Sequence, residues 1–99
     1  MYQEESRQVI DLDSRPTRAD RILARRNADR FVLLNPTSGQ YYTLDDVGAR
    51  VWELCDGTRR VADVISTVHG EYDAPLETIG QDVVDLLSEL AGENLVVAA

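Results

Sequence analysis

Few side chains in this 99-residue sequence are of the types that catalyse reactions or bind metals. His69 is the one histidine and Cys55 the one cysteine, and nothing in the sequence pairs them as base and nucleophile. Cys55 falls on the apolar side of an expected helix, where a thiol packs as a small buried side chain. Asp11 and Asp13 form a D-x-D pair, which in a polar segment is ordinarily solvated. We therefore expect no enzymatic activity, no metal site and no cofactor.

The features that suit binding collect around residues 40–44. Pro36 and Gly39 fit a turn, and residues 40–44 then alternate aromatic, β-branched and aliphatic side chains as strands do. Because helical sequence follows, this strand would be the last of its sheet. If the strands lie in sequence order, it would also be an edge with unpaired N–H and C=O groups. Tyr41 and Tyr42 fit such an edge and fit ordinary sheet and core positions equally well. We interpret the edge as a place where another chain can add a strand.

A stripe of acidic residues runs along one face of the last expected helix, at positions i, i+3, i+7 and i+11: Asp82, Asp85, Glu89 and Glu93. Such a stripe is most often a solvated face. The same helix also carries a main apolar stripe and a second apolar strip beside it, formed by Leu76, Ile79, Val83, Leu86 and Leu90 and by Val84, Leu87 and Ala91. An apolar strip bordered by carboxylates suits an extended peptide with apolar anchors and some positive charge.

The elements that must position these residues follow from hydrophobic periodicity and turn residues. Strands are predicted over three segments, residues 21–26, 30–35 and 40–44. In the last strand, Tyr42 and Leu44 share the core-facing side with Gln40, and Tyr41 and Thr43 share the other side, whereas the second strand is apolar on both faces. Helices are predicted over residues 45–55, 61–69 and from 75 to about 91, with Asp45 and Asp46 at the start of the first. The fold class is therefore α+β, a three-stranded antiparallel sheet followed by three helices.

Length and composition indicate one ordinary globular domain, with 43% hydrophobic and 28% charged residues. Residues 1–19 are polar, contain Pro16 and have only isolated apolar residues, so we expect a flexible N-terminal arm before a folded domain over residues 20–99. No apolar run approaches the roughly 20 residues that span a bilayer. With no signal-peptide pattern and one cysteine, the sequence favours a cytoplasmic protein without a membrane partner.

The negative charge is concentrated in the second part of the chain. Residues 1–60 contain ten arginines and ten acidic residues, whereas residues 61–99 contain eight acidic residues and neither Arg nor Lys, which gives the net charge of −8. A nucleic-acid-binding surface requires the opposite sign. The charge pattern therefore argues against a nucleic acid partner.

Residues 34–57 and 82–96 closely resemble the PqqD-like family. The most specific parts are Val47-Gly48-Ala49 at the strand-to-helix junction and Trp52-Glu53-Leu54-Cys55-Asp56-Gly57 at the helix end. The resemblance covers roughly residues 20–97 and implies a small winged-helix-like domain without catalytic activity. Such domains are recognition elements for the precursors of ribosomally made, modified peptides. They bind the leader of the precursor as an added strand, in the cleft between the third strand and the third helix.

The resemblance also implies partners and site residues. The family presents its leader peptide to a modifying enzyme, which is a radical SAM enzyme in pyrroloquinoline quinone synthesis, or to a leader peptidase in lasso-peptide synthesis. Carried over to this sequence, the peptide-binding residues on the strand and the helix are Gln40, Tyr41, Tyr42, Thr43 and Leu44, with Asp82, Val83, Asp85, Leu86 and Glu89.

Two departures from the family pattern leave alternatives open. Arg60 stands where the second helix often opens with Ser or Thr, and the arm over residues 1–19 is longer than the family core needs. Arginines of the arm could reach the acidic helix, in competition with a peptide or in a homodimer. The rival functions are a winged-helix DNA-binding regulator and a dimerising structural module whose edge strand pairs with its own twin.

Overall fold

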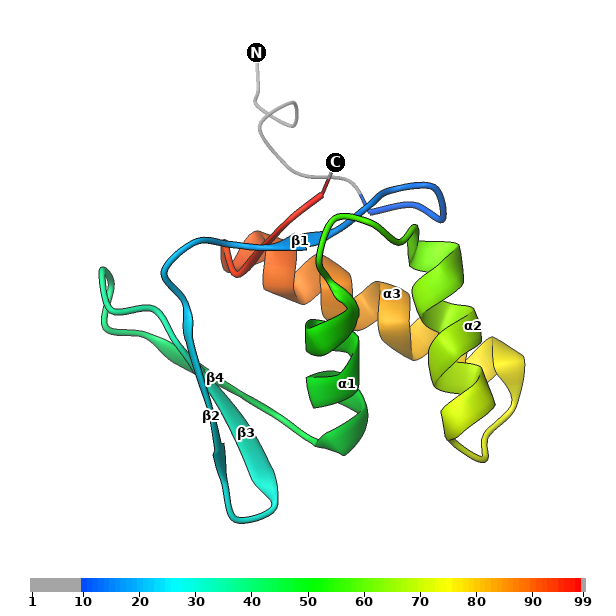
Figure 1. Cartoon of the computed structure of the whole chain (residues 1–99), viewed down its shortest axis with the longest axis horizontal. Coiled ribbons are helices and arrows are strands. Elements are labelled where there is room, and N and C mark those ends of the chain that lie inside the picture. Colours follow the sequence, from blue (N-terminus) through cyan, green and yellow to red (C-terminus); the bar gives the residue numbers. More distant parts are fainter. Residues whose placement is uncertain (1–9, 99) are drawn as a thin grey trace.

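The computed structural model describes residues 10–98, with a β-sheet on one side and three helices on the other (Figure 1). Strands β2, β3 and β4 form an antiparallel sheet in that order, and β1 pairs separately with β5. The elements in chain order are β1 (Thr17–Arg18), β2 (Leu23–Asn27), β3 (Arg30–Leu34), β4 (Tyr41–Leu44), α1 (Asp46–Leu54), α2 (Val61–Glu71), α3 (Leu76–Gly92) and β5 (Val96–Val97). This arrangement confirms the predicted α+β fold of three antiparallel strands followed by three helices.

Strand β4 is an edge of the three-stranded sheet, as the sequence predicts, because β3 lies between β2 and β4. The turn before β4 depends on Asn35, whose Oδ1 accepts the Thr37 N–H at 3.0 Å, and on Gly39, whose φ is +78°. The first strand of the sheet begins at Leu23 and not at residue 21. Arg21 has a φ of +66°, which a strand residue does not adopt, so the strand starts after it.

The first two helices begin in different ways. Asp45 is the N-cap of α1, as predicted, and its Oδ1 accepts the Gly48 N–H at 2.8 Å. Helix α2 follows Arg60. The first N–H groups of this helix, which have no partner within the helix, donate to carbonyls much earlier in the chain. The Val61 N–H donates to the Ser14 carbonyl at 2.8 Å, and the next N–H, of residue 62, donates to the residue 12 carbonyl at 3.0 Å. The departure at Arg60 is therefore compensated by backbone from the N-terminal segment.

Residues 12–18, which we call the strap, cross the C-terminal end of α1 and the start of α2. Pro16 is fully buried, its carbonyl accepts the Gly57 N–H at 3.0 Å, and the Arg18 N–H donates to the Cys55 carbonyl at 2.9 Å. Beyond these contacts, β1 pairs with β5. The strap thus differs from the flexible arm expected over residues 1–19, of which residues 1–9 lie outside the described chain. Backbone pairing of this kind leaves no hydrophobic period in the sequence, so the sequence analysis missed it.

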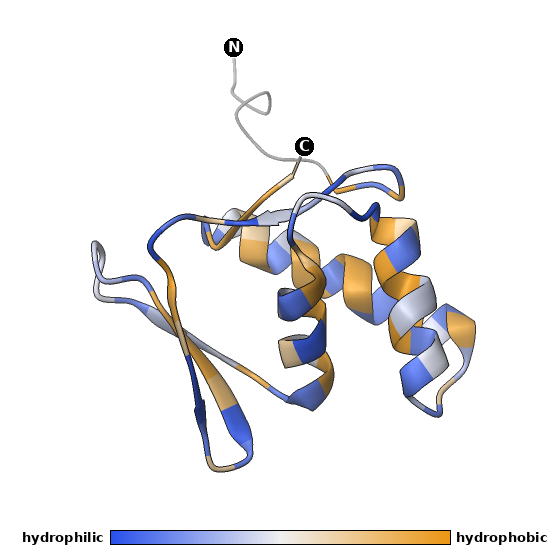
Figure 2. Ribbon diagram, viewed as in Figure 1, coloured by the Kyte–Doolittle hydropathy of each residue, from blue (hydrophilic) through white to orange (hydrophobic). Residues whose placement is uncertain are grey.

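The core lies between the sheet and the helices. Leu33 and Leu44 enter it from the sheet, and hydrophobic residues run along β3 and alternate with hydrophilic ones along the helices (Figure 2). The buried residues of α3 come from both predicted apolar strips: Ile79, Val83, Leu87, Leu90 and Ala91. Val84 and Leu86 are half-buried at the borders, and Leu76 is exposed. Both apolar strips therefore contribute to the core, and α3 has one broad apolar face. No helix in the described residues is long and apolar enough to cross a membrane.

Candidate functional site

The backbone of β4 has a paired side and an open side. The Asn35 N–H donates to the Gln40 carbonyl at 2.9 Å, and hydrogen-bonded pairs alternate along an antiparallel ladder. In the register Leu33↔Tyr42 and Phe31↔Leu44, residues 42 and 44 therefore bond to β3. The N–H and C=O groups of Tyr41 and Thr43 point the other way, and within residues 10–98 no hydrogen bond to them is recorded. The open edge that the sequence predicts thus consists of two specific residues.

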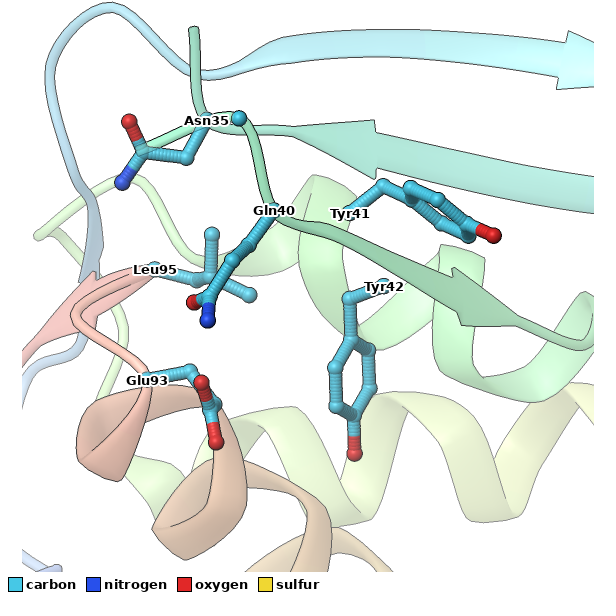
Figure 3. Close-up of a pocket in the computed structure, with 7 residues that line it drawn as sticks. Asn35, Gln40, Tyr41, Tyr42, Glu93 and Leu95 are labelled. Carbon is cyan, nitrogen blue, oxygen red and sulfur yellow. The ribbon is translucent and has the colours of Figure 1, made fainter. Parts of the chain in front are cut away.

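A hollow of about 360 Å³ lies beside this edge, at the C-terminal end of α3. Figure 3 shows the side chains of Gln40, Tyr42, Glu93 and Leu95 around it, with Tyr42 directed toward α3 and Tyr41 directed away. The Tyr42 hydroxyl donates to Glu89 Oε1 at 2.5 Å. This hydrogen bond joins strand and helix, and so brings together two of the residues that the sequence assigns to one site.

The electrostatic environment of Tyr42 is strongly negative. Its hydrogen bond to Glu89, its partial burial and the charges of Glu89 and Glu93 raise the pKa of Tyr42 to about 12. The ion pairs among the described residues join arginines to acids outside α3, namely Asp13, Asp46, Glu53, Asp56, Asp63 and Glu71. The carboxylates of α3 therefore have no cationic partner within residues 10–98.

A second hollow, of about 430 Å³, lies between α1, the α2–α3 connection and the first half of α3. Asp82, Val83 and Leu86 line it, together with Val47 and Ile79. The helix residues assigned by resemblance are thus divided, since these three line the second hollow, whereas Glu89 is hydrogen-bonded to Tyr42, which lines the first. Asp85 is exposed and accepts a hydrogen bond from Gln81 at 2.9 Å.

The strand residues assigned by resemblance take three kinds of position. Gln40 is exposed, and Tyr41 and Thr43 are exposed on the side of the sheet that faces away from the core. Tyr42 is half-buried and Leu44 is buried in the core, as the predicted facing requires. Leu44 therefore anchors β4 to the core, and little of its surface is accessible to a ligand.

Sequence reasoning left other lining residues of the first hollow out of the site: Asn35, Gly39, Glu93 and Leu95. Glu93 is one helical turn after Glu89 in the acidic stripe. The spacing in the sequence could therefore have placed Glu93 in the site. Leu95 follows the end of α3, where the chain turns back through Asn94 with a φ of +61°. Its place under the cleft depends on that turn, which periodicity does not reveal.

The one cysteine packs in the core and is not placed to act as a nucleophile. Cys55 is buried, its Sγ donates to the Val51 carbonyl at 3.2 Å, and burial raises the pKa of its thiol to about 12. A thiol in this state is not a nucleophile at neutral pH. Within residues 10–98 no group of His, Cys, Asp and Glu side chains is arranged to hold a metal ion.

A family model described as "Coenzyme PQQ synthesis protein D (PqqD)" matches residues 30–96, which include the β4 edge, the hollow beside it and the whole of α3. The chain belongs to the PqqD family. A "PqqA binding protein" of Rhodopseudomonas palustris (strain HaA2) is 36% identical over 70 residues, which are 71% of this chain and 67% of the relative. Another, from Xanthomonas axonopodis pv. citri (strain 306), is 36% identical over 88 residues and covers 87% of this chain and 94% of the relative.

Two solved structures share the fold of this chain. TbiB1 in complex with the TbiA(beta) leader peptide is 30% identical with a TM-score of 0.70, over 81% of this chain and 93% of that one. The PqqD truncation of Methylobacterium extorquens PqqCD, described as a functional and stand-alone recognition element for ribosomally synthesized, modified peptides, has a TM-score of 0.73 at 25% identity. That similarity covers 90% of this chain and 95% of the other. The resemblance found in the sequence is thereby confirmed for family and fold.

Proposed function

We propose that this chain is a non-catalytic adaptor that binds the leader segment of a ribosomally made precursor peptide and presents it to a processing enzyme. The observation that carries the proposal is the open backbone of Tyr41 and Thr43 beside a hollowed, acidic cleft. The proposal is supported by the similarity of this chain to PqqA binding proteins and to a protein solved in complex with a leader peptide. The processing enzyme would be a radical SAM enzyme or a leader peptidase, the two classes that the family resemblance implies.

In this mechanism the peptide becomes a fourth strand next to β4. Its backbone exchanges hydrogen bonds with Tyr41 and Thr43, and its side chains alternate between the two faces of the sheet. One set of side chains is directed toward α3, on the side of Tyr42, where the hollow beside Glu93 and Leu95 receives it. The backbone contacts supply affinity for any extended chain, and the hollow supplies selection among sequences.

The charge of the cleft favours a peptide with a basic residue. Glu89 and Glu93 are four residues apart at the C-terminal end of α3, where like charges repel and the helix dipole favours cations. A Lys or Arg of the peptide relieves both unfavourable interactions. Its aliphatic stem packs on the half-buried ring of Tyr42 while its charged end reaches the carboxylates. We therefore infer that the leader combines apolar anchors with at least one basic side chain near this end of β4.

A proline at Thr43 tests the strand addition. The Thr43 N–H points away from β3, so Thr43→Pro leaves the sheet intact and removes one hydrogen bond to the peptide. We expect titration with the cognate leader peptide, followed by Trp52 fluorescence or by calorimetry, to give saturable micromolar or tighter binding. Thr43→Pro should weaken it at least tenfold.

Thr43→Val is the matched control, because it keeps the N–H and the β-branched shape, and it should bind like the unchanged protein. Thermal melting and circular dichroism verify that both variants fold. Equal binding by Thr43→Pro would remove the strand-addition mechanism, and no saturable binding by the unchanged protein would remove the peptide-binding function. Light scattering over a range of concentrations shows whether β4 instead pairs with a second copy of the chain, which would also block peptide binding.

A further inference from the structure

The face of the sheet that points away from the helices has an unusual composition. In the register of the three strands, Leu23 is opposite Leu34, and Leu34 is opposite Tyr41, so these three side chains form one row across the sheet. Val32 stands two residues from Leu34 on the same face. We call this the outer face and define it by Leu23, Arg25, Arg30, Val32, Leu34 and Tyr41.

The outer face is not covered by the described chain. Leu23 is 56% exposed and Tyr41 72% exposed, and neither Val32 nor Leu34 belongs to the hydrophobic core. A hollow of about 490 Å³ on this face is lined by Leu23, Val32 and Leu34 among others. The solvent side of an antiparallel sheet normally carries polar side chains. The sequence already shows that β3 is apolar on both faces. The core accounts for the apolar residues on one face of β3, but not for those on the outer face.

The outer face is also locally basic. Arg25 and Arg30 lie on it, and neither forms an ion pair within residues 10–98, whereas Arg26 on the opposite face pairs with Asp46 at 3.2 Å. Residues 21–30 contain four arginines and one aspartate, a net charge of +3 in a chain of net charge −8. Such a surface fits a partner with an apolar centre and acidic residues around it, and it repels the basic peptide proposed for the cleft.

We propose that the outer face is a docking surface for a second protein with an acid-rimmed apolar patch, namely the enzyme that acts on the bound peptide. This proposal rests on the proposed function, because it names the partner to which the peptide is presented. The geometry supplies the link: a peptide added beside β4 places alternate side chains on the outer face, next to Tyr41. The docked enzyme therefore contacts the adaptor and the peptide on one continuous surface.

The dimensions of the face predict how strongly the two binding events depend on each other. Strands β2, β3 and β4 have five, five and four residues and together cover about 220 Å², and a fourth strand adds about a third to that area. The face alone is small compared with the roughly 800 Å² that each partner buries in a stable complex. Enzyme binding is therefore weak without the peptide and stronger with it, and by reciprocity the enzyme strengthens peptide binding by the same factor.

The test uses three variants of the full chain, Leu23→Glu, Arg25→Glu and the control Leu76→Glu. Leu76 is as exposed as Leu23, at 54% against 56%, but lies at the start of α3, away from the sheet. The probe is the purified enzyme that processes the cognate precursor peptide, titrated with and without the leader in a biosensor assay. We expect Leu23→Glu and Arg25→Glu to weaken enzyme binding at least tenfold, Leu76→Glu to change it less than twofold, and all three to bind the leader alone within twofold of the unchanged protein.

Each other result overturns the proposal. Enzyme binding that Leu23→Glu and Arg25→Glu leave unchanged, or that none of the titrations detects, would show that the outer face does not dock the enzyme. Binding of a 20-base-pair DNA duplex that Arg25→Glu abolishes would assign the face to nucleic acid. Dimerisation of the unchanged protein that Leu23→Glu abolishes would assign it to a second copy. If the unchanged protein does not bind the leader, the proposed function is disproved. Failure of the docking proposal and failure of the proposed function therefore give different results.

Discussion

At the strap and at the β4 edge, the same kind of backbone group has opposite surroundings. The N–H groups of Arg18, Gly57, Val61 and residue 62 all donate to carbonyls of distant parts of the chain. The outward groups of Tyr41 and Thr43 find no such acceptor or donor within residues 10–98. A chain that closes one region with its own backbone can also close another. The open β4 edge is therefore best understood as a surface kept for a different molecule, and the predictions below test that contrast.

The largest expected effect comes from prolines placed in the two regions. Arg18→Pro removes the hydrogen bond to the Cys55 carbonyl and the guanidinium bonds to the carbonyls of Trp52 and Glu53. We expect it to lower the free energy of unfolding by about 3 kcal/mol. Thr43→Pro should lower it by less than about 1 kcal/mol, since its N–H is free. Urea unfolding measures both, and Arg18→Ala separates the side-chain contribution.

Equal destabilisation by the two prolines would contradict the contrast between the regions. A large loss at Thr43 would mean that its N–H is bonded within the folded chain, and a small loss at Arg18 would mean that the strap contributes little.

Two glycines with positive φ provide the next comparison. A Cβ on Gly57 would lie 2.8 Å from Thr17 Oγ1 in the strap, whereas a Cβ on Gly39 would meet nothing within 4 Å. Both alanine variants are strained by the left-handed backbone, which costs about 1 to 2 kcal/mol. Gly57→Ala should lose about 1 kcal/mol more than Gly39→Ala, because the strap must move. Thermal unfolding of the pair measures the difference, and an equal loss would indicate that the strap adjusts freely.

A smaller effect is expected for the charge of the bound peptide. From a display library of random 15-residue peptides, the unchanged protein should enrich sequences with Lys or Arg, and Glu93→Gln should reduce that enrichment. For a selected basic peptide, Glu93→Gln should weaken binding about fivefold, close to 1 kcal/mol. Glu77→Gln, at the other end of α3, is the matched control and should change the affinity less than twofold. Enriched peptides without basic residues would refute the charge preference and leave the strand addition standing.

The smallest effect is a pH dependence of stability from Tyr42. Its pKa is raised to about 12 in the folded chain, above the ordinary value of 10, so the folded state favours the neutral phenol. This contribution is fully present below about pH 10 and is lost as the pH rises toward 12. Absorbance titration at alkaline pH should show one late-ionising tyrosine, which Tyr42→Phe removes and Glu89→Gln shifts back toward 10. Unchanged titration in Glu89→Gln would assign the raised pKa of Tyr42 to burial and not to Glu89.

The sequence predicted the elements whose residues follow a local rule. Asp45 as a helix cap and Leu44 on the core side of β4 follow from capping chemistry and strand alternation. The order of the strands, and with it the open edge, follows from short connections between neighbours.

The rest depends on contacts between distant segments, which local rules do not encode. Ser14 is buried and caps α2 through its carbonyl, although its side chain and its neighbours have no periodic pattern. Leu95 reaches the cleft only because Asn94 reverses the chain after α3. The acidic stripe on α3 was visible in the sequence, but its division between two hollows depends on how α3 crosses the sheet and α1.

The pairing of β1 with β5 has a practical consequence. Residues 17–18 and 96–97 run antiparallel as neighbours, so β5 holds in place the end of the strap that satisfies the first N–H groups of α2. Loss of residues 96–97 would therefore loosen the start of α2 as well as the segment after α3, although the two lie far apart in the sequence. Limited proteolysis or hydrogen exchange of such a truncated chain would show both regions opening together.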